Sequence, residues 1–90
     1  MAMSILKIKI MPASPETDLE KIKKEAMKEI EKLKAKLHDT EIEPIAFGLK
    51  ALILTILWPE DRDLELIENA LGKVEDVNSV QVIDFRRAIG

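Results

Sequence analysis

The chain has 90 residues, the length of one small domain, and we expect a single domain over residues 1–90. Hydrophobic residues make up 47% of it and charged residues 34%, which is typical of a globular rather than a disordered chain. A net charge of −3 and an aromatic content of 3% argue against direct nucleic-acid binding, which favours a basic surface and stacking side chains.

The sequence also argues against membrane and secreted classes. It contains no cysteine, so it has no disulfide and no thiolate metal site. The longest uncharged apolar run, Ala51 to Pro59, is too short to cross a bilayer. Lysines within the first apolar stretch argue against a signal peptide. We therefore expect a cytoplasmic protein.

Residues 5–11 alternate between apolar side chains and lysines, which predicts a strand with one solvent-exposed face. Its apolar face consists of Leu6, Ile8 and Ile10. A loop is expected at Pro12 and Pro15, because proline has no backbone N–H to donate to the hydrogen bonds of a sheet.

A helix is expected next, with Thr17 as its cap and Glu20 completing a capping box. Its apolar stripe has helical spacing and consists of Leu19, Ile22, Ala26, Ile30, Leu33 and Leu37. On the polar face we expect the ion pairs Glu20–Lys24 and Lys21–Glu25. His38 is expected just past the helix end.

Two strands then form a hairpin. Residues 40–45 alternate, and their charges and Pro44 suit an edge strand. Residues 49–58 are apolar at odd and at even positions, which predicts a central strand, with either set of side chains able to face outward.

The last third of the chain predicts a short helix and a final strand. Asp61 or Asp63 caps the helix, and Gly72 suits a left-handed position after it. The helix is amphipathic through Leu64, Ile67, Ala70 and Leu71. The strand covers residues 77–85, and a basic end follows it at residues 86–90.

The order β-α-β-β-α-β predicts an α+β fold of the ferredoxin-like type, a four-stranded antiparallel sheet with two helices on one face. In that topology the first and third strands are central. The other face stays open, and we expect it to be apolar enough to mark a contact. Its apolar residues are Ile5, one parity of the third strand, and Ile83 or Phe85.

Residues suited to catalysis or metal binding are few. The one histidine has no matched nucleophile or carboxylate. Asp61, Asp63 and Glu65 lack the glycine and spacing of a calcium loop, and no glycine-rich phosphate loop occurs. We expect no enzyme activity, no cofactor and no metal.

Phe47 is one of two phenylalanines and lies on the connection between the two hairpin strands, beside Gly48. A large apolar side chain on a turn either folds back into the core or is offered to a partner. The residue pattern alone leaves both readings open.

The stretch Glu43 to Leu52 resembles the signature of the translation elongation factor 1-beta family. Matches in the same order run along the whole chain, at residues 7–12, 14–15, 18–20, 79–82 and 84–88. The short chain and its Arg-Arg-Ala-x-Gly ending resemble the archaeal form, which is a free-standing domain. The resemblance implies a ferredoxin-like guanine-nucleotide exchange domain.

The partner implied by this resemblance is elongation factor 1-alpha, on which the factor promotes GDP release and GTP rebinding during polypeptide elongation. In the family the phenylalanine of the motif contacts the GTPase, which points to Phe47 with Ala46 beside it, while Gly48 allows a close turn. Lys50 either pairs with an acidic partner surface or is a solvated strand lysine. We expect a monomer rather than a dimer.

The C-terminus departs from the family pattern. Eukaryotic relatives carry a lysine near the chain end that is thought to disturb the magnesium and phosphate site, and the ending here has none. Arg86 or Arg87 either replaces that lysine electrostatically or simply trails the final strand.

The same fold is also compatible with other functions. One is a dimerising or small-molecule-sensing module that uses the open face of the sheet. An RNA-binding domain is disfavoured by the acidic charge and the few aromatic residues. An acylphosphatase-like enzyme would need an arginine in the loop after the first strand, and residues 12–15 contain none.

Overall fold

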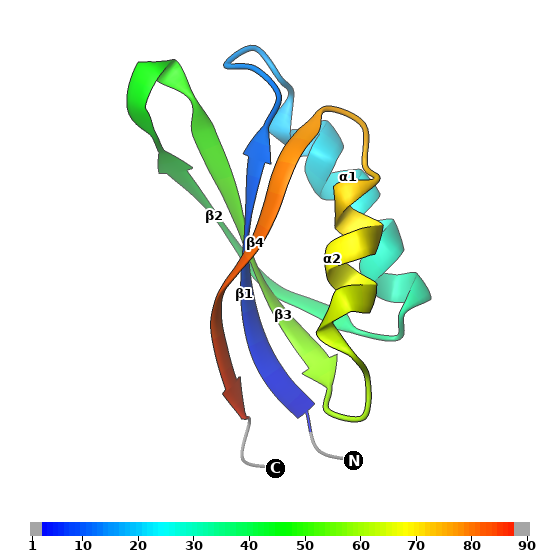
Figure 1. Ribbon diagram of the computed structural model, residues 1–90. Helices are drawn as coiled ribbons and strands as arrows, with labels where there is room; N and C mark the ends of the chain where they lie inside the picture. The colour runs from blue at the N-terminus through cyan, green and yellow to red at the C-terminus, as the bar shows by residue number, and fades with distance from the viewer. Residues whose placement is uncertain (1–2, 88–90) are drawn as a thin grey trace.

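Four strands and two helices follow one another in the predicted order along residues 3–87, the part of the chain that this computed structural model describes (Figure 1). The elements are β1 (Met3–Pro12), α1 (Leu19–Lys32), β2 (Lys36–Pro44), the short helical turn η1 (Ala46–Gly48), β3 (Lys50–Pro59), α2 (Leu64–Gly72) and β4 (Val77–Arg87). Residues 88–90 of the predicted basic end lie outside the described residues.

The strands form one antiparallel sheet in the order β2-β3-β1-β4, with both helices on the same face (Figure 1). Strands β1 and β3 are therefore central and β2 is an edge strand, as predicted. The ferredoxin-like fold class is confirmed.

The core lies between the sheet and the helices. Strand β1 alternates as expected, with Leu6, Ile8 and Ile10 fully buried. The helices contribute Ile22, Ala26, Ile30, Ile67 and Leu71, and β3 contributes Leu52, Leu54, Ile56 and Trp58.

The pairing of β3 with β1 shows which side chains of β3 face away from the helices. Ile53 is opposite Lys9 and Leu57 is opposite Ile5, so the odd-numbered residues of β3 lie on the open face. Ile53 is nevertheless only 7% exposed, with Lys9 and Glu41 opposite it on the two flanking strands.

The open face is less apolar than predicted. Phe85 is opposite Leu6 and therefore lies on the helix face, and the register shifts next to Ile8, where β4 has one extra residue at Ile83. The bulge changes which side chains face outward, and it leaves Asp84 and Arg86 on the open side, opposite Lys7 and Ile5.

Helix α1 begins and ends differently from the prediction. Asp18, not Thr17, is the cap, and its Oδ1 accepts a hydrogen bond from the N–H of Glu20 at 3.0 Å. The hydroxyl of Thr17 instead accepts from the N–H of Ser14. Lys34 adopts a left-handed backbone with φ 59°, which stops the helix.

Two further corrections follow from the helix ends. Leu37 and His38 belong to β2, because α1 ends at Lys32. Gly72 is the last residue of α2, and the left-handed residue comes four positions later, at Asp76, with φ 68°. Asp63 caps α2, which decides between the two predicted candidates.

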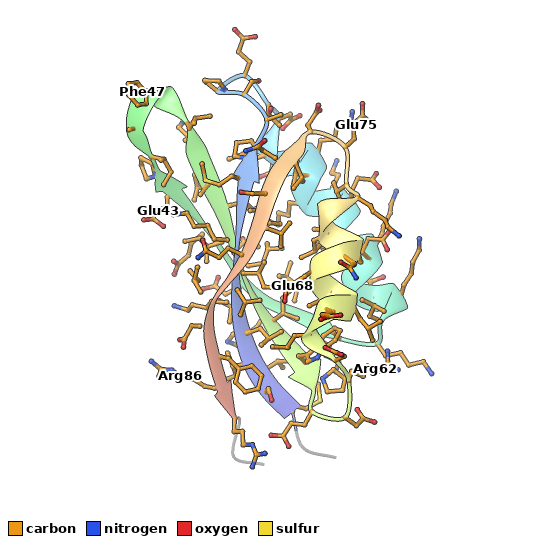
Figure 2. The ribbon with its side chains drawn as sticks, in the orientation of Figure 1. Glu43, Phe47, Arg62, Glu68, Glu75 and Arg86 are labelled. Atoms are coloured by element: carbon orange, nitrogen blue, oxygen red, sulfur yellow. The ribbon has the colours of Figure 1, made fainter. Side chains whose placement is uncertain are left out.

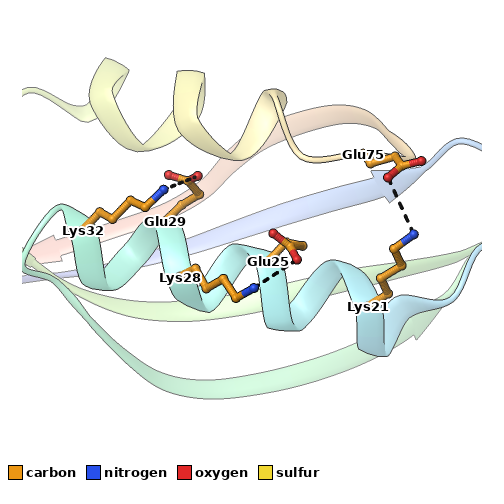
Figure 3. A network of polar contacts seen from close by, with 6 residues as sticks. All are labelled: Lys21, Glu25, Lys28, Glu29, Lys32 and Glu75. Carbon is orange, nitrogen blue, oxygen red and sulfur yellow. Dashed lines mark hydrogen bonds and ion pairs between the residues drawn. The ribbon is translucent and has the colours of Figure 1, made fainter.

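The ion pairs on α1 also differ from those predicted (Figure 3). Lys21 pairs with Glu75 across the helix layer at 3.6 Å, and Glu25 pairs with Lys28, so the Lys21–Glu25 pair is not formed. No ion pair joins Glu20 and Lys24 within residues 3–87. The observed pairs are largely exposed and contribute little to stability.

A chain of two hydrogen bonds ties the loop after β3 to the end of α1. The buried Trp58 donates from Nε1 to the carbonyl of Arg62 at 3.1 Å, and Arg62 donates from Nη1 to the carbonyl of Leu33 at 2.7 Å. The second bond satisfies one of the carbonyls left free at a helix end.

We expect Arg62→Met to lower the free energy of unfolding by about 1–2 kcal/mol, because the Leu33 carbonyl loses a charged donor. Denaturant unfolding measures this change. Lys73→Met is the control, since Lys73 is exposed and a surface substitution stays within about 0.5 kcal/mol. Equal stability of the two variants would contradict this role for Arg62.

Candidate functional site

The connection between β2 and β3 is a tight three-residue turn, η1, at the tip of the hairpin. The N–H of Ile45 donates to the carbonyl of Leu49 at 2.7 Å, and the N–H of Leu49 donates to the carbonyl of Ala46 at 3.4 Å. These bonds close the turn, and β3, which follows it, is one of the two central strands of the sheet. Phe47 is therefore carried by a short, well-supported loop.

Two successive residues of this turn have left-handed backbones. Phe47 has φ 63° and ψ 29°, and Gly48 has φ 78°. Glycine adopts this conformation without a steric penalty, whereas a bulky side chain costs about 1–2 kcal/mol. The turn therefore accommodates glycine at position 48 but is strained by phenylalanine at position 47.

The Phe47 side chain is 95% exposed, and it projects from the tip of the hairpin (Figure 2). It has no share in the core, so the reading in which Phe47 folds back is wrong. Neither burial nor a favoured backbone accounts for a phenylalanine at this position. Strained residues of this kind cluster at functional sites.

A hollow of about 380 Å³ lies between the hairpin and the β1–α1 loop. Gly48 and Lys50 line its hairpin side, and Pro12, Pro15 and Asp18 belong to the other side. Lys50 is exposed, and within residues 3–87 it forms no ion pair. Sequence reasoning missed this hollow, because it forms from segments about 30 residues apart.

Arg86 and Arg87 belong to β4, which runs two residues further than predicted. Both side chains are exposed. Arg87 pairs through Nε with Glu60 at 3.2 Å, and Arg86 pairs through Nε with Asp84 at 3.3 Å. The arginines thus form the end of β4 itself and do not follow the strand, while their replacement of the missing lysine stays a prediction.

The predicted site residues fall into two groups at opposite ends of the sheet (Figure 1). Arg87 is level with Trp58 across the sheet, while Leu52 is level with Ile10 near the hairpin end. The six residue steps of β3 from Leu52 to Trp58 span about 20 Å, and Phe47 lies beyond Leu52. The structure brings Ala46, Gly48 and Lys50 together with Phe47, and it keeps both arginines apart from them.

The described residues include neither a metal-binding cluster nor a membrane-spanning helix. No group of three or more histidine, cysteine or acidic residues in residues 3–87 is arranged to hold a metal ion. None of the helices in that range is long and apolar enough to span a membrane.

Comparison with known proteins adds a family match. Residues 5–88 match the family described as EF-1 guanine nucleotide exchange domain. Elongation factor 1-beta of Methanocaldococcus jannaschii is 42% identical over 90 residues, covering 98% of this chain and all of that protein. Elongation factor 1-beta of Methanosarcina acetivorans is 51% identical over 83 residues, covering 90% of this chain and 92% of that protein.

One solved structure supports the fold alone. An unknown protein from Galdieria sulphuraria superposes with a TM-score of 0.60 at 18% identity. The match covers 100% of this chain and 47% of that one.

We expect Phe47→Gly to raise the free energy of unfolding by about 1 kcal/mol, because glycine removes the left-handed strain. Phe47→Ala keeps the strained backbone and loses no burial, so its stability should stay within about 0.5 kcal/mol. Denaturant unfolding tests both variants, and Leu54→Ala serves as the buried control, with an expected loss of about 2–5 kcal/mol. A loss of that size in Phe47→Ala would show that Phe47 is part of the core.

Proposed function

The chain belongs to the EF-1 guanine nucleotide exchange domain family, and we propose on this basis that it promotes GDP release and GTP rebinding on elongation factor 1-alpha. The observation that carries the proposal is the 95% exposed Phe47 on a strained turn, within the part of the chain that resembles the family signature. The factor acts in the cytoplasm during polypeptide elongation, as a monomer.

Exchange of this kind needs a difference in affinity and no covalent chemistry. A factor that binds the nucleotide-free GTPase more tightly than the loaded form must weaken nucleotide binding by the same factor. Equal affinity for the two forms would leave the nucleotide unaffected. The factor therefore needs a contact that is complete only when part of the nucleotide site has moved.

Phe47 suits such a contact. Its turn is closed by two backbone hydrogen bonds, so the backbone that carries the ring does not have to be ordered on binding. An exposed phenylalanine that becomes buried against a partner gains apolar burial that the free protein lacks. Ala46 precedes Phe47 and Gly48 follows it and lets the chain turn, while Lys50 begins β3 three residues after Phe47.

The arginine end provides a second contact. Because Arg86 and Arg87 lie more than about 20 Å from the hairpin tip, they and Phe47 reach different parts of the GTPase. The arginines supply positive charge, which affects the association rate and the salt dependence more than a buried apolar anchor does. In this scheme Phe47 anchors the complex and the arginines orient it.

A self-pairing module is the weaker alternative. It would use the open face of the sheet, where Ile53 and Thr55 are already nearly buried within one copy. The apolar side chains that a second copy could cover there, such as Ile5 and Leu57, are themselves partly buried.

We expect Phe47→Ala to slow exchange by about 30-fold or more at a subsaturating concentration, the loss typical of a central aromatic contact. Release of a fluorescent GDP analogue from elongation factor 1-alpha, with substoichiometric factor, measures the rate. Leu66→Ala is the matched control, because Leu66 is an exposed apolar residue on α2. Equal losses in the two variants would rule out a specific role for Phe47.

We expect Arg87→Gln to slow exchange several-fold at low ionic strength and much less at high ionic strength, since screening weakens exposed charges. Lys73→Gln removes the same charge from an exposed position between α2 and β4 and controls for the change in net charge. A salt-independent loss, or an equal loss in the control, would contradict the electrostatic role.

A further inference from the structure

The hollow beside the hairpin has an apolar residue that the fold leaves uncovered. Ile42 is opposite Leu52 in the sheet, so both side chains lie on the helix face. Leu52 is 2% exposed, whereas Ile42 is 55% exposed. The difference arises because the hairpin tip extends past the helices, and α1 begins too far away to cover β2 at this level (Figure 1).

The walls of the hollow are preformed. A side-chain carbon at Gly48 would lie 3.9 Å from the Cβ of Pro15, so the η1 turn and the β1–α1 loop are already in close approach. The loop is held by the hydrogen bond from the N–H of Ser14 to Thr17 and by the Asp18 cap of α1. A ligand that enters does not have to order these segments.

The rim of the hollow carries more negative than positive charge. Asp18 and Glu20 contribute carboxylates and Lys50 contributes an ammonium group, and all three residues are exposed. Small-molecule sites usually bury most of the ligand around a few enclosed polar groups, and this hollow has no such enclosure. Its apolar floor and acidic rim instead complement a protein segment that carries an apolar side chain next to a basic one.

We propose that this hollow, formed by Ile42, Gly48, Pro15 and the start of α1, is a second docking pocket for the GTPase that contacts Phe47. The inference rests on the proposed function. One apolar side chain of the GTPase packs on Ile42, and a neighbouring lysine or arginine faces Asp18 and Glu20. Gly48 belongs to both the turn and the hollow, so the lining of the pocket begins at the residue next to Phe47.

The test is a titration of GDP-analogue release from elongation factor 1-alpha with variants of this protein. Ile42→Ala should raise the half-maximal concentration about fivefold, as expected for losing burial of part of one aliphatic side chain. Ile42→Arg should raise it further, since it places a cation against the partner's basic group. Leu66 on α2 is 46% exposed, so Leu66→Ala and Leu66→Arg are the matched controls. Both should leave the half-maximal concentration unchanged.

The charge complementarity has its own pair of variants. Glu20→Gln should raise the half-maximal concentration about threefold at low ionic strength, and the effect should fade with added salt. Glu31→Gln removes the same charge from an exposed position at the far end of α1 and should have no effect.

Three results would overturn the inference, and they are distinguishable. Unchanged titrations for the Ile42 variants, with Phe47→Ala defective, would refute the pocket and leave the proposed function standing. No acceleration by the unmodified protein would refute the proposed function and the pocket with it. A concentration-dependent dimer of this protein that Ile42→Arg abolishes would assign the hollow to a second copy instead.

Discussion

Burial of β3 on both faces is the constraint on which the rest of the structure depends. Residues 51–56 are all buried, one side beneath the helices and the other beneath flanking side chains of the sheet. Packing holds such a strand in a single register, because a slip of one residue would replace Leu52, Leu54 and Trp58 in the core by odd-numbered side chains of different size and shape. The position of the hairpin tip follows directly, since η1 is attached to the first residue of this strand. The rigidity of the candidate contact is thus a consequence of core packing.

The turn itself shows where packing and function diverge. Everything in β3 is consistent with stability, whereas Phe47 has an unfavourable backbone conformation and almost no contact with the protein. A protein that needed only the fold would favour glycine or asparagine at this position. The local conflict between residue type and conformation is the kind of exception that marks a site rather than an error of folding.

The sequence predicted the fold well because its periodicities are strong. Alternation in β1 and the doubly apolar β3 were enough to place both strands in the centre of the sheet. The helix ends were predicted less well: Thr17 and Asp18 are both good caps, and only the loop geometry selects Asp18. The left-handed Lys34 that ends α1 has no signal in its residue type, which is why Leu37 and His38 were placed in or next to a helix instead of in a strand. The bulge in β4, which moves Phe85 to the helix face, is equally invisible in the pattern.

The candidate site was predictable only in part, for a related physical reason. Phe47 stands out because a large apolar residue beside glycine conflicts with a turn, and that conflict is local in the sequence. The distance between Phe47 and the arginines, and the exposure of Ile42, depend on how strands pair and where helices stop. Ile42 reads as an ordinary alternating strand residue, and it becomes exposed only because α1 does not extend over the end of β2. If a GTPase binds as proposed, Phe47 on the turn and Ile42 on β2 would give it two separate apolar contacts on one hairpin. A GTPase surface that fitted only one of them would gain only part of the available burial, and a change in that surface on nucleotide release would then alter the affinity of the complex.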